Sequence, residues 1–229
     1  MALPYYVSPE QMMADKAEYA KKGIAKGRSI VAMEYADGVL LVADNPSASL
    51  HKISEMYDRI AFAGAGKYNE FEMLRKAGIR HADLKGYTYS REDVAAKSLA
   101  NAYSQTIGSI FSADPKPLEV ELLVVEVGQD GKPNEIYRIS YDGSIIDEKG
   151  VAAVGGKAEA LLTFLKSRWA APTLALREAL KLSIDALDTV TNQKLAAEGL
   201  ELAVLDRTRP GRAFRRVAPG EARALLNSP

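Results

Sequence analysis

Few residues in this sequence have the type and spacing that catalysis or metal binding requires. The chain of 229 residues has no cysteine, which excludes disulfides, thiol catalysis and cysteine-ligated metals. Its two histidines, His51 and His81, stand apart from any acidic cluster at metal-ligand spacing, so we interpret both as solvated or core-edge side chains. We therefore expect no metal site and no cofactor.

Two further patterns indicate binding sites only weakly. Gly155-Gly156 before a predicted helix is a lone pair of glycines, and close packing of a strand against a helix explains it better than a phosphate site does. Arginines gather between residues 207 and 216, but 30 Lys and Arg residues balance 30 Asp and Glu residues, whereas nucleic-acid binding favours a basic surplus. We interpret this run as a solvated edge strand or an ion-pair surface between subunits.

The stretch from residue 28 to residue 66 has the clearest strand pattern. Two apolar runs flank Asp37-Gly38, and this pair predicts a hairpin with a type I′ turn. The second run is apolar almost throughout, which is typical of a strand covered on both faces. From the residues alone, Asp44 is a turn residue at the end of that strand, and Lys52 is an ordinary solvated lysine.

A helix is predicted ahead of the strands, over residues 8–27. Ser8 has the features of an N-cap, with Pro9 at the first helical position and Gln11 completing a capping box. One apolar stripe follows at helical spacing and consists of Met13, Ala17, Ala20 and Ile24. This stripe packs either on the chain's own sheet, which general considerations favour, or on a neighbouring molecule.

The rest of the chain alternates between pairs of helices and groups of strands. A helix over 67–84, a short extended piece over 86–89 and a long helix capped by Ser90 come next. The predicted order is one helix, four strands, two helices, three strands, two helices and two strands. Adjacent helices exclude a parallel βαβ sheet, so we expect an α+β fold with two facing antiparallel sheets, each covered by a helix pair. This is a four-layer αββα sandwich with an extra N-terminal helix, in a single domain over 1–229.

Targeting signals are not evident in the sequence. Its apolar runs are all shorter than the ~20 residues that a membrane span requires. The N-terminus shows no basic region followed by an apolar stretch, so we predict no signal peptide. A soluble cytoplasmic protein without a membrane or nucleic-acid partner is the expectation.

The strand block resembles the first four strands of 20S proteasome subunits, which have the N-terminal-nucleophile hydrolase fold. Catalytic subunits of that family begin their mature chain at the first strand with a threonine nucleophile. This chain has Arg28 at that place after a full helix, and it contains no Gly-Thr dipeptide for processing. Asp44 and Lys52 lie where catalytic subunits keep an acidic residue and a lysine, but without the threonine they do not run that chemistry.

The segment before the strands is similar to the N-terminal signature of the α-type, non-catalytic subunits. The signature residues are Ser8-Pro9-Glu10 and Glu18-Tyr19-Ala20. Two departures, the one-residue longer spacing and the absence of a Tyr-Asp-Arg motif at Tyr5-Tyr6-Val7, resemble the actinobacterial branch.

The resemblance implies a structural and gating role rather than catalysis. Such a subunit forms homo-heptameric outer rings around catalytic β-type subunits, and its tail over 1–7 closes the entry pore. Lys52 would line a pocket between neighbouring subunits and receive the C-terminal carboxylate of an AAA ATPase activator, because an ammonium at the mouth of a partly dry pocket anchors a carboxylate well. In the actinobacterial branch that ATPase would deliver pupylated proteins. The implied gate residues are Leu3, Pro4, Tyr5, Tyr6, Val7, Ser8 and Pro9, and the implied ring contacts are Met12, Met13 and Tyr19.

Two alternatives remain open at this point. The first is a catalytic peptidase of the same fold, whose nucleophile is exposed by processing before Ser29. The second is a plain α+β binding module, which predicts a monomer. An intact N-terminus at Met1 or Ala2 contradicts the first alternative, and a ring contradicts the second.

Overall fold

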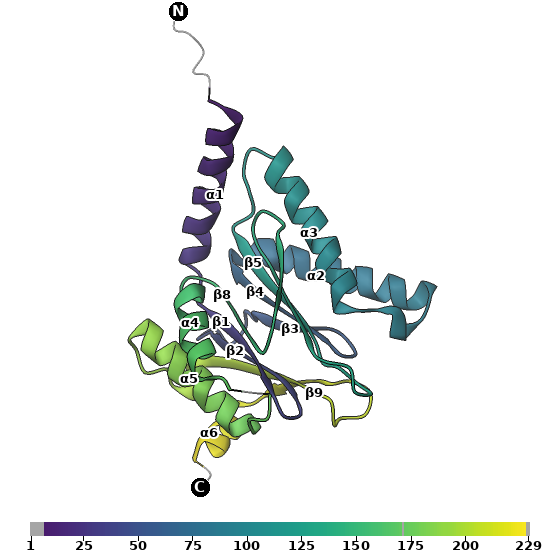
Figure 1. Cartoon of the computed structure of the whole chain (residues 1–229), viewed down its shortest axis with the longest axis vertical. Coiled ribbons are helices and arrows are strands. Elements are labelled where there is room, and N and C mark those ends of the chain that lie inside the picture. Colours follow the sequence, from purple (N-terminus) through teal and green to yellow (C-terminus); the bar gives the residue numbers. More distant parts are fainter. Residues whose placement is uncertain (1–6, 171, 228–229) are drawn as a thin grey trace, which may run out of the picture.

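Two five-stranded antiparallel sheets face each other in the centre of the molecule (Figure 1). The structure is a computed structural model, and it describes residues 7–170 and 172–227. The first sheet has the strand order β10-β9-β2-β1-β8 and the second β3-β4-β5-β6-β7. The first consists of β1 (Ile30–Tyr35), β2 (Gly38–Asp44), β8 (Val151–Val154), β9 (Leu200–Asp206) and β10 (Phe214–Val217), and the second of β3 (Ile53–Tyr57), β4 (Ile60–Gly66), β5 (Val120–Glu126), β6 (Glu135–Ile139) and β7 (Ile145–Glu148).

A pair of helices covers the outer face of each sheet, as predicted (Figure 1). α4 (Ala158–Arg168) and α5 (Leu176–Thr191) cover the first sheet, and α2 (Tyr68–Thr88) and α3 (Ala96–Ala113) cover the second. The remaining helices are α1 (Pro9–Ala25), α6 (Pro219–Asn227) and the short 3-10 turns η1 (Arg91–Asp93) and η2 (Ala197–Gly199). The four-layer αββα sandwich is therefore confirmed.

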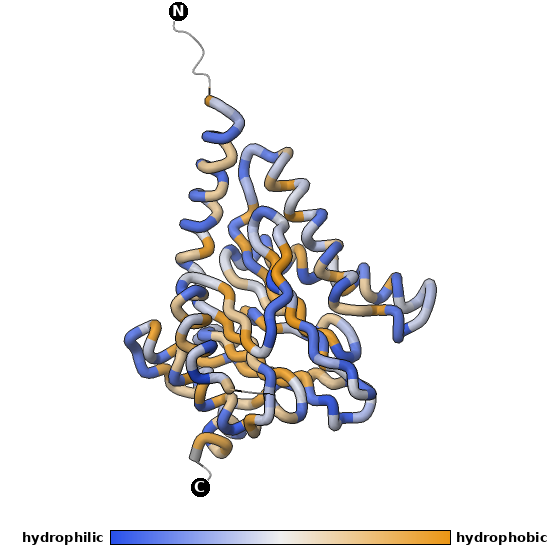
Figure 2. Tube along the Cα trace, viewed as in Figure 1, coloured by the Kyte–Doolittle hydropathy of each residue, from blue (hydrophilic) through white to orange (hydrophobic). Residues whose placement is uncertain are grey.

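The core consists of three apolar layers, one between the sheets and one beneath each helix pair. On β2, Val39 and Leu41 belong to the layer between the sheets, whereas Leu40 and Val42 belong to the layer beneath α4 and α5. Because successive side chains of a strand point to opposite faces, a strand covered on both sides is apolar at every position. Figure 2 shows this as apolar colour concentrated on the central strands.

The hairpin at Asp37-Gly38 forms, but the predicted type I′ turn is wrong. Tyr35 pairs with Gly38, so the loop is Ala36-Asp37 and Gly38 is already part of β2. Asp37 does not have a positive φ. Glycine is required at position 38 because a Cβ there would lie 1.8 Å from the carbonyl oxygen of Leu205 on the adjacent strand β9.

Three predictions for the middle of the chain need correction. α2 runs unbroken to Thr88, so the extended piece predicted over 86–89 is helical for most of its length. Ser90 caps η1 through its Oγ, and α3 starts only at Ala96, whose N–H donates to Glu126 Oε2 at 2.7 Å. The second group of strands, between α3 and α4, contains four strands rather than three, because β7 and β8 join different sheets.

α1 begins as predicted, but only its C-terminal half packs on the sandwich (Figure 1). Ser8 Oγ accepts a hydrogen bond from Gln11 N at 3.2 Å, whereas the Gln11 side chain donates to Asp15 instead of completing a capping box. Lys16, Ala20 and Ile24 are buried, and Lys16 Nζ donates to carbonyl oxygens at the end of α3. Met13, which was predicted in the buried stripe, is exposed.

The described part of the chain contains no helix with the length and apolarity needed to cross a membrane.

Candidate functional site

Lys52 lies at the end of a loop between the two sheets. The loop runs from Asn45, directly after β2 of the first sheet, to Lys52, directly before β3 of the second. Ser47 N donates to Asn45 Oδ1, and Leu50 N donates to Ser47 Oγ at 3.0 Å, so the loop carries its own hydrogen bonds. These bonds order the loop and so give Lys52, at its end, a defined position.

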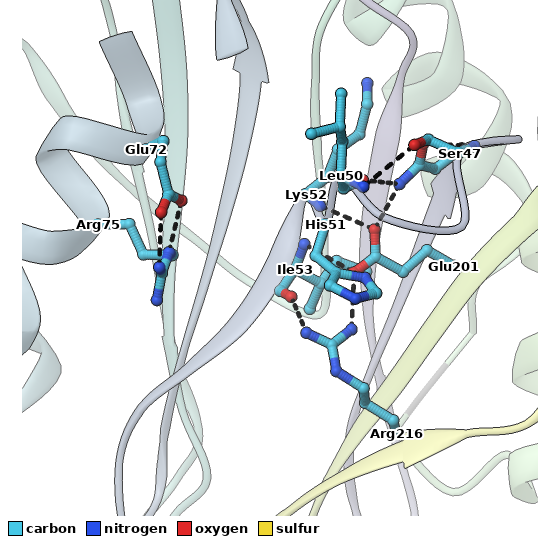
Figure 3. A network of polar contacts seen from close by, with 10 residues as sticks. Ser47, Leu50, His51, Lys52, Ile53, Glu72, Arg75, Glu201 and Arg216 are labelled. Carbon is cyan, nitrogen blue, oxygen red and sulfur yellow. Dashed lines mark hydrogen bonds and ion pairs between the residues drawn. The ribbon is translucent and has the colours of Figure 1, made fainter. Parts of the chain in front are cut away.

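A buried carboxylate on β9 anchors this loop from below (Figure 3). Glu201 Oε2 accepts from the backbone N–H of Lys52 at 2.8 Å, and Oε1 accepts from the N–H of Ile53 at 3.2 Å. Asn45 Nδ2 donates to Oε2 at 2.8 Å, and Arg216 Nη1 donates to Oε1 at 2.7 Å. One carboxylate thus joins the loop, the first strand residue after it and the edge strand β10.

His51 completes this set of contacts. Its Nδ1 lies 3.3 Å from Glu201 Oε1, and its ring is about half exposed. The interpretation of His51 as a solvated or core-edge side chain holds for its exposure, but it missed the acidic neighbour. Among the described residues, no group of three or more histidines and carboxylates has the arrangement of a metal site.

The side chain of Lys52 extends away from Glu201 (Figure 3) and reaches the start of β1. Its Nζ donates to the carbonyl oxygen of Arg28 at 2.9 Å. Arg28 Nη1 in turn donates to Asp44 Oδ1 at 2.7 Å, and Asp44 is buried at the end of β2. Asp44 is thus both the strand-end residue that was predicted and an ion-pair partner that was not.

Burial lowers the pKa of Lys52 to about 8. The nearby Asp44 carboxylate opposes this shift, Arg28 adds to it, and Glu201 opposes it. Lys52 is therefore a partly desolvated ammonium that still carries its charge at neutral pH. Such a group attracts a carboxylate more strongly than a fully hydrated lysine does.

The position of Arg28 carries no hydroxyl or thiol nucleophile. The adjacent Ser29 is an internal residue of the segment that leads from α1 into β1. It is buried, and its carbonyl oxygen accepts a hydrogen bond from Asp44 N at 3.1 Å. This arrangement suits charge recognition, because it places the Lys52 ammonium and the Arg28 guanidinium close to the Asp44 carboxylate.

The other predicted site residues lie apart from Lys52. α1 begins at Pro9, with Ser8 as its N-cap and Val7 ahead of it. On the helix, Met12, Met13 and Tyr19 are 47%, 38% and 48% exposed. At a rise of 1.5 Å per residue, Met12 is about 20 Å along the helix axis from Ala25, which leads into Arg28. Leu3, Pro4, Tyr5 and Tyr6 lie outside the described residues.

A groove of about 740 Å³ lies beside the outer part of α1. Val7, Met12 and Tyr19 form one side of it, and Pro115 and Pro117 contribute from the segment after α3. Neither proline was among the predicted site residues.

The basic run and the glycine pair have structural roles. β10 is an edge strand, as predicted, and arginines in and before it pair within the chain: Arg212, ahead of the strand, is bonded to Glu55, and Arg215 of β10 to Glu221. A Cβ on Gly156 would lie 2.4 Å from the carbonyl oxygen of Ala25, so this glycine permits close packing against the end of α1.

Comparisons with known proteins identify the family of the chain. A model of the proteasome subunit family matches residues 24–205. The chain is 56% identical over 233 residues to the proteasome subunit alpha of Streptomyces coelicolor, covering 100% of this chain and 91% of the relative. The subunits alpha of Sanguibacter keddieii (54% over 233 residues, 100% and 91% covered) and Kineococcus radiotolerans (54% over 234 residues, 99% and 98% covered) are similar to the same extent.

The expected actinobacterial likeness is confirmed, since all three organisms are actinobacteria. The two facing sheets and the extra N-terminal helix also match the N-terminal-nucleophile hydrolase fold that the resemblance implied. Because the family match spans most of the chain and the relatives align over nearly all of it, the chain belongs to the proteasome subunit family and is of its α type.

Proposed function

We propose that this chain is a non-catalytic subunit of the outer heptameric rings of a 20S proteasome. In that role it gates substrate entry and docks an ATPase activator for protein degradation. The observation that carries the proposal is the half-buried Lys52 ammonium, held at the carbonyl oxygen of Arg28 where a catalytic subunit would have its nucleophile. The printed names of the relatives, proteasome subunit alpha, support the same role.

Ring assembly is the first part of the proposal. Met12 and Tyr19 line the groove beside α1, Met13 is exposed on the same helix, and exposed apolar side chains of this kind favour a protein partner. We assign these three residues to contacts between copies of this chain in a homo-heptamer. Catalytic β-type subunits are the partners inside the particle.

Gating is the second part. Residues 1–7 precede the outer end of α1, so seven copies in a ring would bring seven tails together at the entry. The gate set comprises Leu3, Pro4, Tyr5, Tyr6, Val7, Ser8 and Pro9. The helix over 8–27 then connects this tail to the sandwich over 28–229.

Activator docking is the third part. A C-terminal carboxylate of an AAA ATPase would replace part of the hydration of Lys52 and form a charge-assisted hydrogen bond with its ammonium. The substrates delivered in this way would be proteins, and pupylated ones if the actinobacterial likeness extends to the activator. Degradation itself takes place in the cytoplasm at the β-type subunits.

Processing before Ser29 is the alternative that the fold argues against. Ala20 and Ile24 of α1 are buried against the sandwich ahead of Ser29, so removal of residues 1–28 would expose apolar core. This supports our proposal that the chain is not an enzyme by itself.

Substitution Lys52→Ala tests the docking role. In the particle assembled with the organism's β-type subunit, we expect ring assembly to persist and ATPase-stimulated degradation to be abolished. Lys132→Ala, which removes an exposed lysine from the loop before β6, is the matched control and should leave stimulation unchanged. Full stimulation of the Lys52→Ala particle would contradict the docking role.

A further inference from the structure

We propose that Glu201 is a positioning residue for activator docking, because its carboxylate fixes the backbone of Lys52 for an incoming anion. The inference rests on the proposed docking function and extends it to a residue far from Lys52 in sequence. Glu201 and Lys52 are separated by 149 positions, with Glu201 on β9 of the first sheet and Lys52 directly before β3 of the second.

The first support is the location of β3 at the edge of its sheet. β3 pairs with β4 on one side only, so the outward N–H of Ile53 has no strand to bond. Glu201 Oε1 accepts from this N–H, and Oε2 accepts from that of Lys52. A side chain from the other sheet thus takes the place of a neighbouring strand where the lysine is held.

The second support is that the carboxylate is itself fixed. Arg216 donates Nη1 to Glu201 Oε1 and Nη2 to the carbonyl oxygen of Ile53, both at 2.7 Å. Asn45 donates one amide nitrogen to both Glu201 Oε2 and the carbonyl oxygen of Leu50. Glu201 is buried, its two oxygens accept hydrogen bonds from four donors, and His51 Nδ1 lies 3.3 Å from Oε1.

The third support is that different groups hold the backbone and the side chain of Lys52. Glu201 holds its backbone, while its ammonium bonds to the carbonyl oxygen of Arg28, so the two ends of the residue are fixed independently. A ligand that replaces the Arg28 contact therefore meets an ammonium whose stem is already ordered. Preorganisation of this kind raises affinity by reducing the ordering cost of binding.

Glu201→Gln is the discriminating substitution. Glutamine keeps the shape, but one oxygen becomes an amide nitrogen that cannot accept a hydrogen bond. Both oxygens of Glu201 accept backbone N–H groups, so one of the two amides loses its partner whichever way the glutamine turns. Binding must then order the Lys52 stem, and the entropy cost of immobilising one long side chain corresponds to up to about a tenfold loss in affinity.

The experiment measures binding of a fluorescent octapeptide to the assembled particle of α and β subunits. The probe is the C-terminal octapeptide of the organism's proteasomal ATPase with a free carboxylate. Its amidated form serves as the control ligand. The variants are Glu201→Gln, Lys52→Ala, the double variant and Glu148→Gln. Glu148 on β7 is the matched protein control, since it is buried and paired with Arg138 of β6 and Lys166 of α4. It lies at the edge of the second sheet opposite β3.

We expect Glu201→Gln to weaken binding about tenfold in the presence of Lys52 and to have no effect in the Lys52→Ala background. Glu148→Gln should bind like the wild type. An equal loss in both backgrounds, or no loss in either, would overturn the positioning role of Glu201. If Lys52→Ala itself leaves the affinity unchanged, the proposed docking function fails instead.

Two further readouts separate positioning from a general loss of structure. Hydrogen exchange at the amides of Lys52 and Ile53 should accelerate in Glu201→Gln while the amides of β7 stay protected, and unchanged exchange would contradict the inference. The pH midpoint of octapeptide binding should also move down in this variant, because the charge of Glu201 raises the pKa of Lys52 while Arg28 and Asp44 remain in place. An unchanged midpoint would indicate that Glu201 acts on stability alone.

Discussion

The ammonium of Lys52 donates a 2.9 Å hydrogen bond to the carbonyl oxygen of Arg28. In the catalytic relatives that the sequence resembles, this place holds a free threonine at the start of the chain. Here it holds an internal peptide group and an arginine paired with Asp44. Lys52 therefore faces a backbone carbonyl oxygen, where the lysine of a catalytic subunit would face the threonine nucleophile. We infer that its charge serves recognition.

Docking through Lys52 should depend on pH. Burial lowers its pKa to about 8, so the charged form dominates below pH 8 and the neutral form above it. We expect the affinity for the free-carboxylate octapeptide to be constant near pH 6.5 and to fall by about tenfold per pH unit above pH 8. Fluorescence anisotropy between pH 6.5 and 9.5 measures this. An affinity that stays constant up to pH 9.5 would show that the ammonium is not the anchor.

The same titration affects folding in the opposite direction. Because the pKa of Lys52 is lower in the folded state than its ordinary value of 10.5, the unfolded chain binds the proton more tightly. The free energy of unfolding therefore gains a contribution as the pH rises from about 8 towards 10.5. Urea unfolding of the wild type and of Lys52→Met across this range checks the sign, since the variant lacks this gain. A parallel pH dependence of the two proteins would refute the assignment.

Removal of residues 2–7 should open the pore. If the tails form the gate, the truncated α subunits assembled with β subunits should hydrolyse small peptides faster than the intact particle in the absence of an ATPase. The truncation leaves Ser8 in place, so the N-cap of α1 and its bond to Gln11 N are kept. Equal basal rates for the truncated and intact particles would mean that another segment closes the pore.

Gly78→Ala should destabilise the packing of α2 on α3. A Cβ at position 78 would lie 1.8 Å from the Tyr103 hydroxyl and 2.4 Å from Met56, and that hydroxyl is bonded to the carbonyl oxygen of Leu74 at 3.1 Å. We expect a loss of about 1–3 kcal/mol in the free energy of unfolding, measured by urea denaturation. Gly220→Ala in α6, where a Cβ meets no atom within 4 Å, is the control and should not destabilise. Equal stability of the two variants would contradict the close approach of the helices.

The periodic parts of the fold were predictable from the sequence. β2 is apolar at both its inward and outward positions, and this pattern correctly predicted a strand covered on two faces. Ser8, Pro9 and the stripe through Ala20 and Ile24 likewise predicted α1 and its buried side. These features are local, since each depends on residues within a few positions of one another.

The contacts that hold Lys52 in place were not predictable in this way. Glu201 alternates with Leu200 and Leu202, so in the sequence it looks like an outward residue of a half-exposed strand. It is buried because the start of β3 and Arg216 reach it, and no local spacing encodes that contact. The available signal is an acidic residue near the start of a strand whose next four positions, 202–205, are all apolar. Gly38 is similar, because Leu205 rather than a turn requires it.

The central claim is that this chain forms the heptameric ring of a proteasome with its own N-terminus intact. Native mass spectrometry of the purified chain mixed with the organism's β-type subunit tests this most directly. The account predicts particles whose α content is a multiple of seven, with each α chain starting at Met1 or Ala2. A monomer, or a chain trimmed to Ser29, would contradict it.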